Sequence, residues 1–183
     1  MKNHRFLFSL LVSTLTFSCT NTSTQYPPPK HIIGAVELVQ VEGLEYRARI
    51  DTGADITSIH AYDITIENEE ENLNANIGKQ LYFKTANEKG ETKLIEAKIV
   101  NVNTVRNALG KESRYVVQLA IAWGDYVKTV DVNLKNRTNM QFALLIGRNW
   151  LKDDFIVDVS DEEDQMQEKN SLIEKLLPNI LTH

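Results

Sequence analysis

The middle of the chain is built from short runs in which apolar and polar residues alternate. Residues 46–50 place Tyr46, Ala48 and Ile50 on one face and two arginines on the other, as a half-buried strand requires. Turn signals such as Lys89-Gly90 and Gly124-Asp125 separate several of these runs. No long helical pattern lies between them, so the sequence predicts an all-β domain with a closed or nearly closed barrel. The predicted strands are residues 32–39, 46–50, 81–85, 94–100, 115–123, 126–134 and 155–159.

A second element, at residues 143–151, combines an apolar strand, Gly147 and a segment with helical potential. We expect a buried strand that ends at this glycine and a short helix directly after it. Residues 67–76 are acidic and rich in asparagine, which favours a solvated loop.

The two ends of the chain differ from this pattern. Residues 1–19 have a basic start, an uncharged apolar run at 6–17 and then Cys19, the one cysteine of the chain. The run is too short for a membrane span but suits a secretory signal, and Cys19 resembles the lipid-attachment site of bacterial lipoproteins. An ordinary cleaved signal with an incidental cysteine is the alternative. We therefore expect a periplasm-facing lipoprotein of the bacterial cell envelope, held to the membrane by its N-terminal lipid, or an exported soluble protein.

Residues 20–30 are polar, contain three consecutive prolines at 27–29 and predict an extended tether. The predicted domain follows at 31–160. The tail at 161–183 is acidic and then places four apolar residues at helical spacing before Pro178, which indicates either a short docking helix or a frayed end.

Composition narrows the possible partners. The chain has 183 residues and 42% hydrophobic residues, which suits one globular domain. Its net charge of −5 argues against a nucleic-acid partner. A single cysteine also leaves no internal disulfide for an oxidising compartment.

The candidate chemistry begins at Asp51-Thr52-Gly53, directly after the strand at 46–50. Aspartate and glycine are ordinary turn residues, so the tripeptide alone is a weak signal. Its position is more informative, because a tight glycine-containing loop after a strand can hold a carboxylate rigidly with backbone N–H groups.

Residues 51–55, followed by Thr57, together with Leu145-Ile146-Gly147-Arg148-Asn149 resemble the retropepsin class of aspartic peptidases. The closer resemblance is to a bacterial family of retropepsin-like domains often labelled ATP-dependent zinc proteases, and it covers about residues 31–160. The resemblance implies a retropepsin-like barrel in which Asp51 is the catalytic carboxylate and Thr52 and Gly53 brace its loop. It also implies a buried ion pair between Asp55 and Arg148.

The zinc and ATP of that label find no support in the residues. The chain has four histidines, His4, His31, His60 and His183, no His-Glu-x-x-His motif and no phosphate-binding loop. We therefore expect no cofactor and no metal. His60 lies nine residues after Asp51 and is either close to the site or, more simply, a polar residue at a strand end.

Aspartic proteolysis needs two carboxylates that share one proton, yet the sequence has one Asp-Thr-Gly. A twofold homodimer with one Asp51 from each chain would complete the site. Residues 102–113 are the candidate flap over a peptide or protein substrate. Arg106, Arg114 and Arg137, which belong to the family pattern, would favour an acidic substrate, unless they are solvated arginines at strand edges.

The sequence thus predicts an exported aspartic endopeptidase acting in the envelope. Two alternatives remain open: a catalytically inactive binding module on the same barrel, and a structural envelope lipoprotein whose domain only docks a partner.

Overall fold

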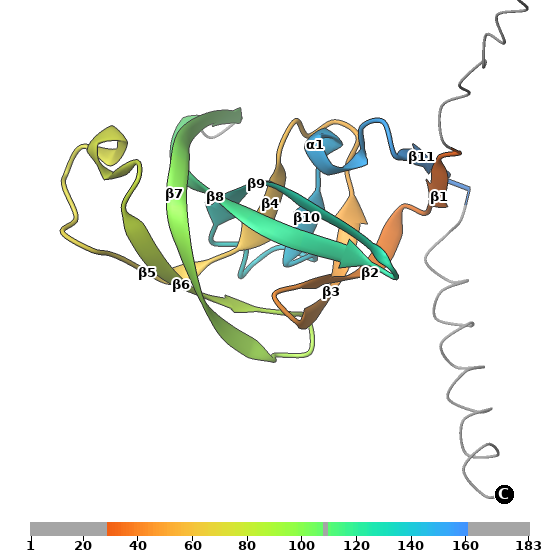
Figure 1. Ribbon diagram of the computed structural model, residues 1–183, viewed down its shortest axis with the longest axis horizontal. Coiled ribbons are helices and arrows are strands. Elements are labelled where there is room, and N and C mark those ends of the chain that lie inside the picture. The colour runs from red at the N-terminus through yellow and green to blue at the C-terminus, as the bar shows by residue number, and fades with distance from the viewer. Residues whose placement is uncertain (1–28, 108–109, 161–183) are drawn as a thin grey trace, which may run out of the picture.

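The computed structural model describes residues 29–107 and 110–160 of the chain (Figure 1). The predicted signal with Cys19, the tail and nearly all of the tether lie outside these residues. No helix in the described ranges is long and apolar enough to cross a bilayer. The elements in chain order are β1 (His31–Ile33), β2 (Val36–Val41), β3 (Leu44–Ile50), β4 (Thr57–His60), β5 (Tyr62–Ile66), the 3-10 helix η1 (Leu73–Asn76), β6 (Gln80–Ala86), β7 (Thr92–Asn107), β8 (Gly110–Trp123), β9 (Tyr126–Lys135), β10 (Leu144–Ile146), α1 (Arg148–Leu151) and β11 (Phe155–Val157).

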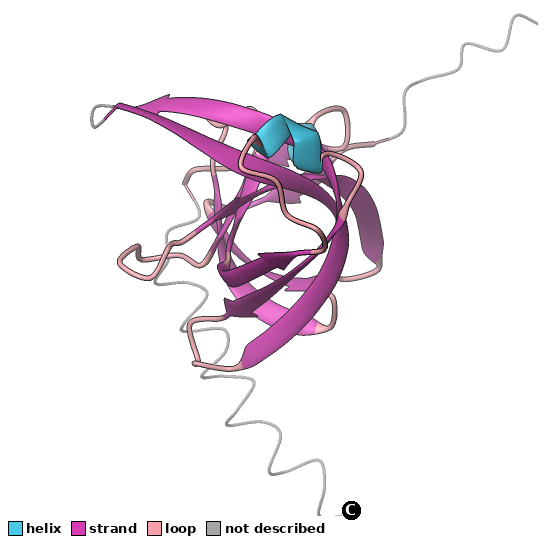
Figure 2. Ribbon diagram, turned by 90° about the vertical axis from the view of Figure 1, so that its left-hand side faces the viewer, coloured by secondary structure: helices cyan, strands magenta, loops and turns pink. Residues whose placement is uncertain are grey.

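Six strands form a closed ring, which Figure 2 shows from one side. Their order is β2-β3-β10-β4-β9-β8, and β2 also pairs with β8 through Gln40↔Ala122 and Val41↔Ile121. The remaining strands of this sheet, β7, β6 and β5, continue outward from β8. The predicted all-β closed barrel is therefore confirmed, and so is the short helix after Gly147.

Alternation along the strands places one apolar face inside the barrel. Tyr46, Ala48 and Ile50 of β3 are all buried, as their period of two predicts. The Tyr46 hydroxyl lies 2.8 Å from the Thr85 hydroxyl, so this polar group is paired inside the core. Removal of the apolar side chains from water supplies the main driving force for this fold.

The strand predicted at 32–39 is wrong as a single element. It divides after Ile33, where the Gly34 N–H donates to the Glu37 carboxylate over 2.7 Å. The two halves then have different partners, because β1 pairs with β11 in parallel and β2 pairs with β3. The short strands β4 and β5 went unpredicted, and β7 and β8 are longer than expected. Their long hairpin carries the segment predicted as a flap, and residues 108–109 at its tip lie outside the described ranges.

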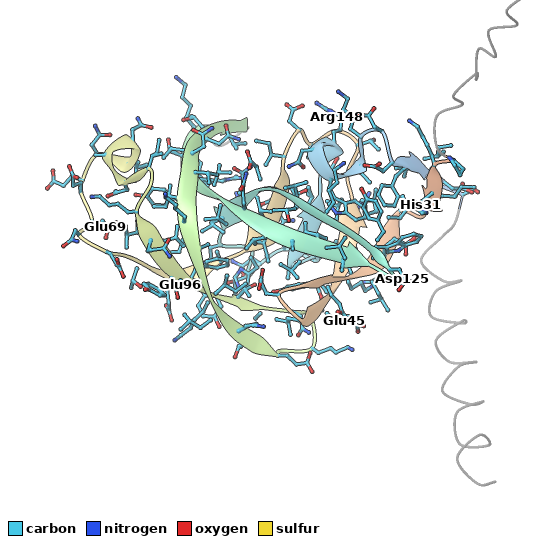
Figure 3. All side chains as sticks on the ribbon, viewed as in Figure 1. His31, Glu45, Glu69, Glu96, Asp125 and Arg148 are labelled. Atoms are coloured by element: carbon cyan, nitrogen blue, oxygen red, sulfur yellow. The ribbon has the colours of Figure 1, made fainter. Side chains whose placement is uncertain are left out.

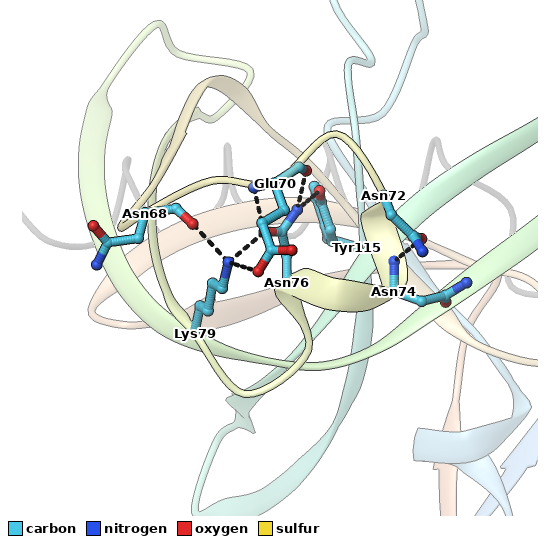
Figure 4. A network of polar contacts seen from close by, with 7 residues as sticks. All are labelled: Asn68, Glu70, Asn72, Asn74, Asn76, Lys79 and Tyr115. Carbon is cyan, nitrogen blue, oxygen red and sulfur yellow. Dashed lines mark hydrogen bonds and ion pairs between the residues drawn. The ribbon is translucent and has the colours of Figure 1, made fainter.

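The acidic, asparagine-rich loop before β6 is held by several hydrogen bonds, which its composition did not predict. Asn76 is fully buried, and its amide binds the backbone of Glu70 and the Tyr115 hydroxyl of β8 (Figure 4). Lys79 adds bonds to the Asn68 carbonyl at 2.6 Å and to the Glu70 carboxylate at 2.9 Å. A satisfied polar network of this kind fixes the loop against β8.

Candidate active site

Asp51 follows β3 directly and lies in the loop between β3 and β4, two strands that both pair with β10. β10 runs parallel to β3 with Ile146 opposite Ile50, and antiparallel to β4 with Leu145 opposite Ser58. The Asp51 N–H donates to the Ile146 carbonyl at 2.9 Å, which continues the ladder into the loop. The Gly53 N–H then donates to Asp51 Oδ1 at 2.9 Å. The carboxylate is thereby oriented by backbone, as expected for this loop.

Gly147 allows the chain after β10 to approach the chain before β4. A Cβ atom at this position would lie 2.7 Å from the Ile56 carbonyl carbon and 2.9 Å from the Thr57 nitrogen, closer than real Cβ atoms come to backbone. The Gly147 N–H donates to the Thr57 hydroxyl over 3.1 Å. Glycine is required here by space rather than by backbone dihedral angles.

Thr57 and Asn149 form a brace that the sequence analysis missed. Asn149 Oδ1 accepts from the N–H and from the hydroxyl of Thr57, each at 3.0 Å, and Asn149 Nδ2 donates to the Asp131 carbonyl at 2.7 Å. The brace therefore connects the loop of Asp51 to α1 and β9. Both residues stand in the motifs that carried the family resemblance, and this was the available signal.

Arg148 holds the outer side of the loop. Its guanidinium donates to the carbonyls of Thr52 at 2.9 Å and Gly53 at 3.0 Å and forms an ion pair with Asp55. The predicted pair is present, but it is not buried, because the side chains of Arg148 and Asp55 are 50% and 82% exposed. Arg148 is the first residue of α1 and projects at the surface of the domain (Figure 3).

Of the three predicted arginines, Arg137 is the one on which the charges of both Asp51 and Arg114 act. Burial lowers the pKa of Arg137, the charge of Arg114 lowers it further, and the charge of Asp51 acts in the opposite direction. The Arg114 side chain, only 9% exposed, pairs with Glu112 at 2.5 Å, and Lys135 binds the same carboxylate at 2.9 Å. Arg106 lies on β7 with its backbone opposite Lys111, and its side chain is outside the described part of the structure.

His60 ends β4 and is only 7% exposed. Its Nδ1 atom accepts a hydrogen bond of 2.9 Å from the backbone N–H of Arg137. His60 is thus both a residue at a strand end and a direct neighbour of a predicted site residue.

Asp51 is half-buried, and within the described ranges its carboxylate accepts one hydrogen bond, that from Gly53. It makes no hydrogen bond to a second carboxylic acid there. Nor do the described residues contain a group of three or more His, Cys, Asp or Glu side chains that could hold a metal ion. The chemistry that this geometry offers is that of one positioned carboxylate with guanidinium groups nearby.

Comparison with known proteins points to one family. Residues 32–168 match the RimB-like family model, described as the retropepsin-like aspartic endopeptidase RimB. The chain is also similar to a "Probable alpha-L-glutamate ligase" of Shewanella halifaxensis, 28% identical over 80% of this chain and 32% of that protein. A protein of the same description from Shewanella pealeana is 30% identical over 72% of this chain and 29% of its own length.

A solved structure supports the same conclusion about the fold. The crystal structure of Lpg0085 from Legionella pneumophila, a protein of unknown function, superimposes with a TM-score of 0.56 and 32% sequence identity. The match covers 70% of this chain and 93% of the Legionella chain. In contrast, the chain spans only about a third of the length of the ligase-named relatives, 32% and 29% in the two cases.

Proposed function

Because this chain belongs to the RimB-like family of retropepsin-like aspartic endopeptidases, we propose that it hydrolyses peptide bonds with Asp51 as its catalytic carboxylate. The observation that carries the proposal is the loop geometry. Asp51 stands at the end of a barrel strand, its carboxylate is oriented by the Gly53 N–H at 2.9 Å, and Arg148 and Asn149 brace the two sides. A structural turn residue would not need this many supports.

The active site in this proposal is formed by two copies of the chain. The surface around Asp51 is suited to a partner, since Thr52 and Gly53 are exposed and so is the ion pair of Asp55 with Arg148. The two-stranded sheet of β1 and β11 also exposes apolar side chains, with Ile32 at 66% and its register partner Ile156 at 55%. A twofold axis beside Asp51 would bring the two carboxylates together.

The pair of carboxylates works as one acid and one base. Like charges about 3 Å apart do not ionise together readily, so the two carboxylates share a single proton in the active form. The ionised Asp51 takes a proton from water, and the oxygen of that water bonds to the carbonyl carbon of the peptide while the protonated Asp51 of the partner stabilises the carbonyl oxygen. Proton transfer to the peptide nitrogen then breaks the C–N bond and yields a carboxylic acid and an amine.

The substrate in this proposal is an acidic peptide that contains glutamate. The charges of Asp51 and Arg114 both act on Arg137, and guanidinium groups bind carboxylates in a bidentate manner. The ligase-named relatives match this chain over part of their length, and an alpha-L-glutamate ligase forms bonds to glutamate. In this proposal, the chain hydrolyses bonds of that kind.

The location belongs to the same proposal. Residues 1–19 would direct export, and Cys19 would carry the lipid that attaches the enzyme to an envelope membrane. Metabolic labelling with a fatty acid, compared between the wild type and Cys19→Ala, would test the attachment, and unchanged labelling would refute it.

Cleavage of defined peptides tests the catalytic part. Wild type, Asp51→Asn and Asp125→Asn would be incubated with glutamate-rich and neutral peptides at acidic and neutral pH. Asp125 is a matched control because it is an exposed aspartate in the turn between β8 and β9. We expect hydrolysis by wild type and Asp125→Asn, inhibition by pepstatin-like mimics, and no hydrolysis by Asp51→Asn. Equal cleavage by wild type and Asp51→Asn would refute the proposal.

A further inference from the structure

His60 holds both ends of the segment that carries Arg137. The His60 N–H donates to the Ala143 carbonyl at 2.7 Å, and His60 Nδ1 accepts from the Arg137 N–H at 2.9 Å. Within the segment, Arg137 Nε donates to the Phe142 carbonyl at 2.9 Å. The connection between β9 and β10 is therefore held near both of its ends by hydrogen bonds to His60.

The bond from Arg137 restricts the protonation state of the ring. An imidazole nitrogen accepts a hydrogen bond only when it carries no proton, so Nδ1 must be free and the ring neutral. A second proton on His60 would place an N–H against the Arg137 N–H. That bond would be lost, and two donors would face each other inside a site where His60 is only 7% exposed.

The charges around the ring also oppose its protonation. Arg137 is the charged residue of this connection. Burial lowers the pKa of His60 below its ordinary value of 6.5, and the charge of Arg137 lowers it further. A hydrogen bond with the Lys135 backbone acts in the other direction. On β9, Lys135 lies opposite His60 and its ammonium group is bound to Glu112 of β8.

In the part of the chain that the structure describes, the other elements packed against His60 contribute an aromatic ring, aliphatic side chains and one charged pair. On β5, Tyr62 stacks on the imidazole with ring centroids 5.2 Å apart. β10 contributes only leucine and isoleucine. Lys84 of β6 lies opposite Tyr62 and is paired with Asp63.

We infer that His60 is a positioning residue, which in its neutral form fixes Arg137 within reach of the charge of Asp51 and releases it when protonated. This rests on the proposed function, because Arg137 matters only if it binds the carboxylate of an acidic substrate. The consequence is that substrate binding weakens as the solution becomes acidic, even though the catalytic step needs one of the two carboxylates to be protonated.

Peptide binding without turnover tests this inference. A glutamate-rich peptide would be titrated into Asp51→Asn, Asp51→Asn/His60→Asn and Asp51→Asn/His60→Leu at about pH 7.5 and about pH 5.5, a range in which glutamate stays ionised because its pKa is about 4.3. Asparagine offers Oδ1 as an acceptor for the Arg137 N–H and does not titrate, whereas leucine fills space without an acceptor.

For Asp51→Asn we expect Kd to rise at the lower pH by up to about tenfold, which is the value of one hydrogen bond and the limit reached when His60 is fully protonated. The variant with His60→Asn should keep the tighter Kd at both pH values, and the variant with His60→Leu should bind weakly at both. The inference is overturned if His60→Asn leaves the pH dependence unchanged, if His60→Leu binds as tightly as its parent, or if no variant binds the peptide. Peptidase activity is judged separately on the wild type, so binding with no hydrolysis would reject the catalytic proposal and leave this one standing.

Discussion

The hydrogen bonds of Asn149 should contribute a large part of the domain's free energy of unfolding. In Asn149→Ala, the N–H and the hydroxyl of fully buried Thr57 lose their acceptor, and the Asp131 carbonyl loses its donor. Each hydrogen bond contributes about 1 kcal/mol net, and each buried group left without a partner costs about 1–3 kcal/mol. The three losses together predict a decrease of about 3 kcal/mol in the free energy of unfolding.

Urea denaturation followed by tryptophan fluorescence would measure this decrease, because Trp150 is next to Asn149 in α1 and is fully buried. Asn139→Ala is the matched control. Asn139 is exposed and makes no hydrogen bond within the described contacts, so its replacement should change the free energy of unfolding by less than about 0.5 kcal/mol.

The expected activity follows from the same contacts. The Thr57 hydroxyl accepts from the Gly147 N–H, and the residue before Gly147 accepts from the Asp51 N–H. Loosening of the brace should therefore lower kcat more than it raises KM. The Asp51 carboxylate would change its position, whereas Arg137 would keep its own. A change below about 1 kcal/mol in Asn149→Ala would show that water or a neighbouring group replaces the amide, and the reasoning would be refuted.

Two further predictions concern the core and the rim of the barrel. Tyr46→Phe removes the partner of the buried Thr85 hydroxyl and should lower the free energy of unfolding, measured with heat or urea, by about 1–2 kcal/mol. Tyr82→Phe is the control and should be nearly neutral, because it removes a hydrogen bond at the exposed surface. Because burial raises the pKa of Tyr46 from 10.0 to about 12, the folded protein should lose stability as pH rises from 10 toward 12, and Tyr46→Phe should lose less over that interval. Arg148→Lys should lower kcat while changing the free energy of unfolding by less than about 1 kcal/mol. The pair with Asp55 is exposed, but only a guanidinium can donate from Nη1 to the two loop carbonyls and from Nη2 to Asp55 at once. Equal loss of stability in Arg148→Lys and Asn149→Ala would contradict this difference.

The sequence by itself determined the class of fold and the position of the candidate chemistry. Alternation at residues 46–50 reports burial of one side of a strand, and this signal is local, so β3 was predicted correctly within two residues. The order strand, Gly147, helix was equally readable, because glycine and the apolar run act on neighbouring residues. The Asp-Thr-Gly tripeptide gave the location of the loop after β3.

Only the tertiary structure decided which segments meet. Closure of the barrel depends on β2 pairing with β8, and alternation carries no information about the partner of a strand. The bond between His60 and Arg137 joins residues 77 positions apart, and the brace of Thr57 with Asn149 joins residues 92 apart. The exposure of the Asp55 pair was also beyond the sequence. A side chain's burial and its hydrogen-bond partner are set by what the rest of the chain places around it, and that arrangement exists only after the sheet has closed.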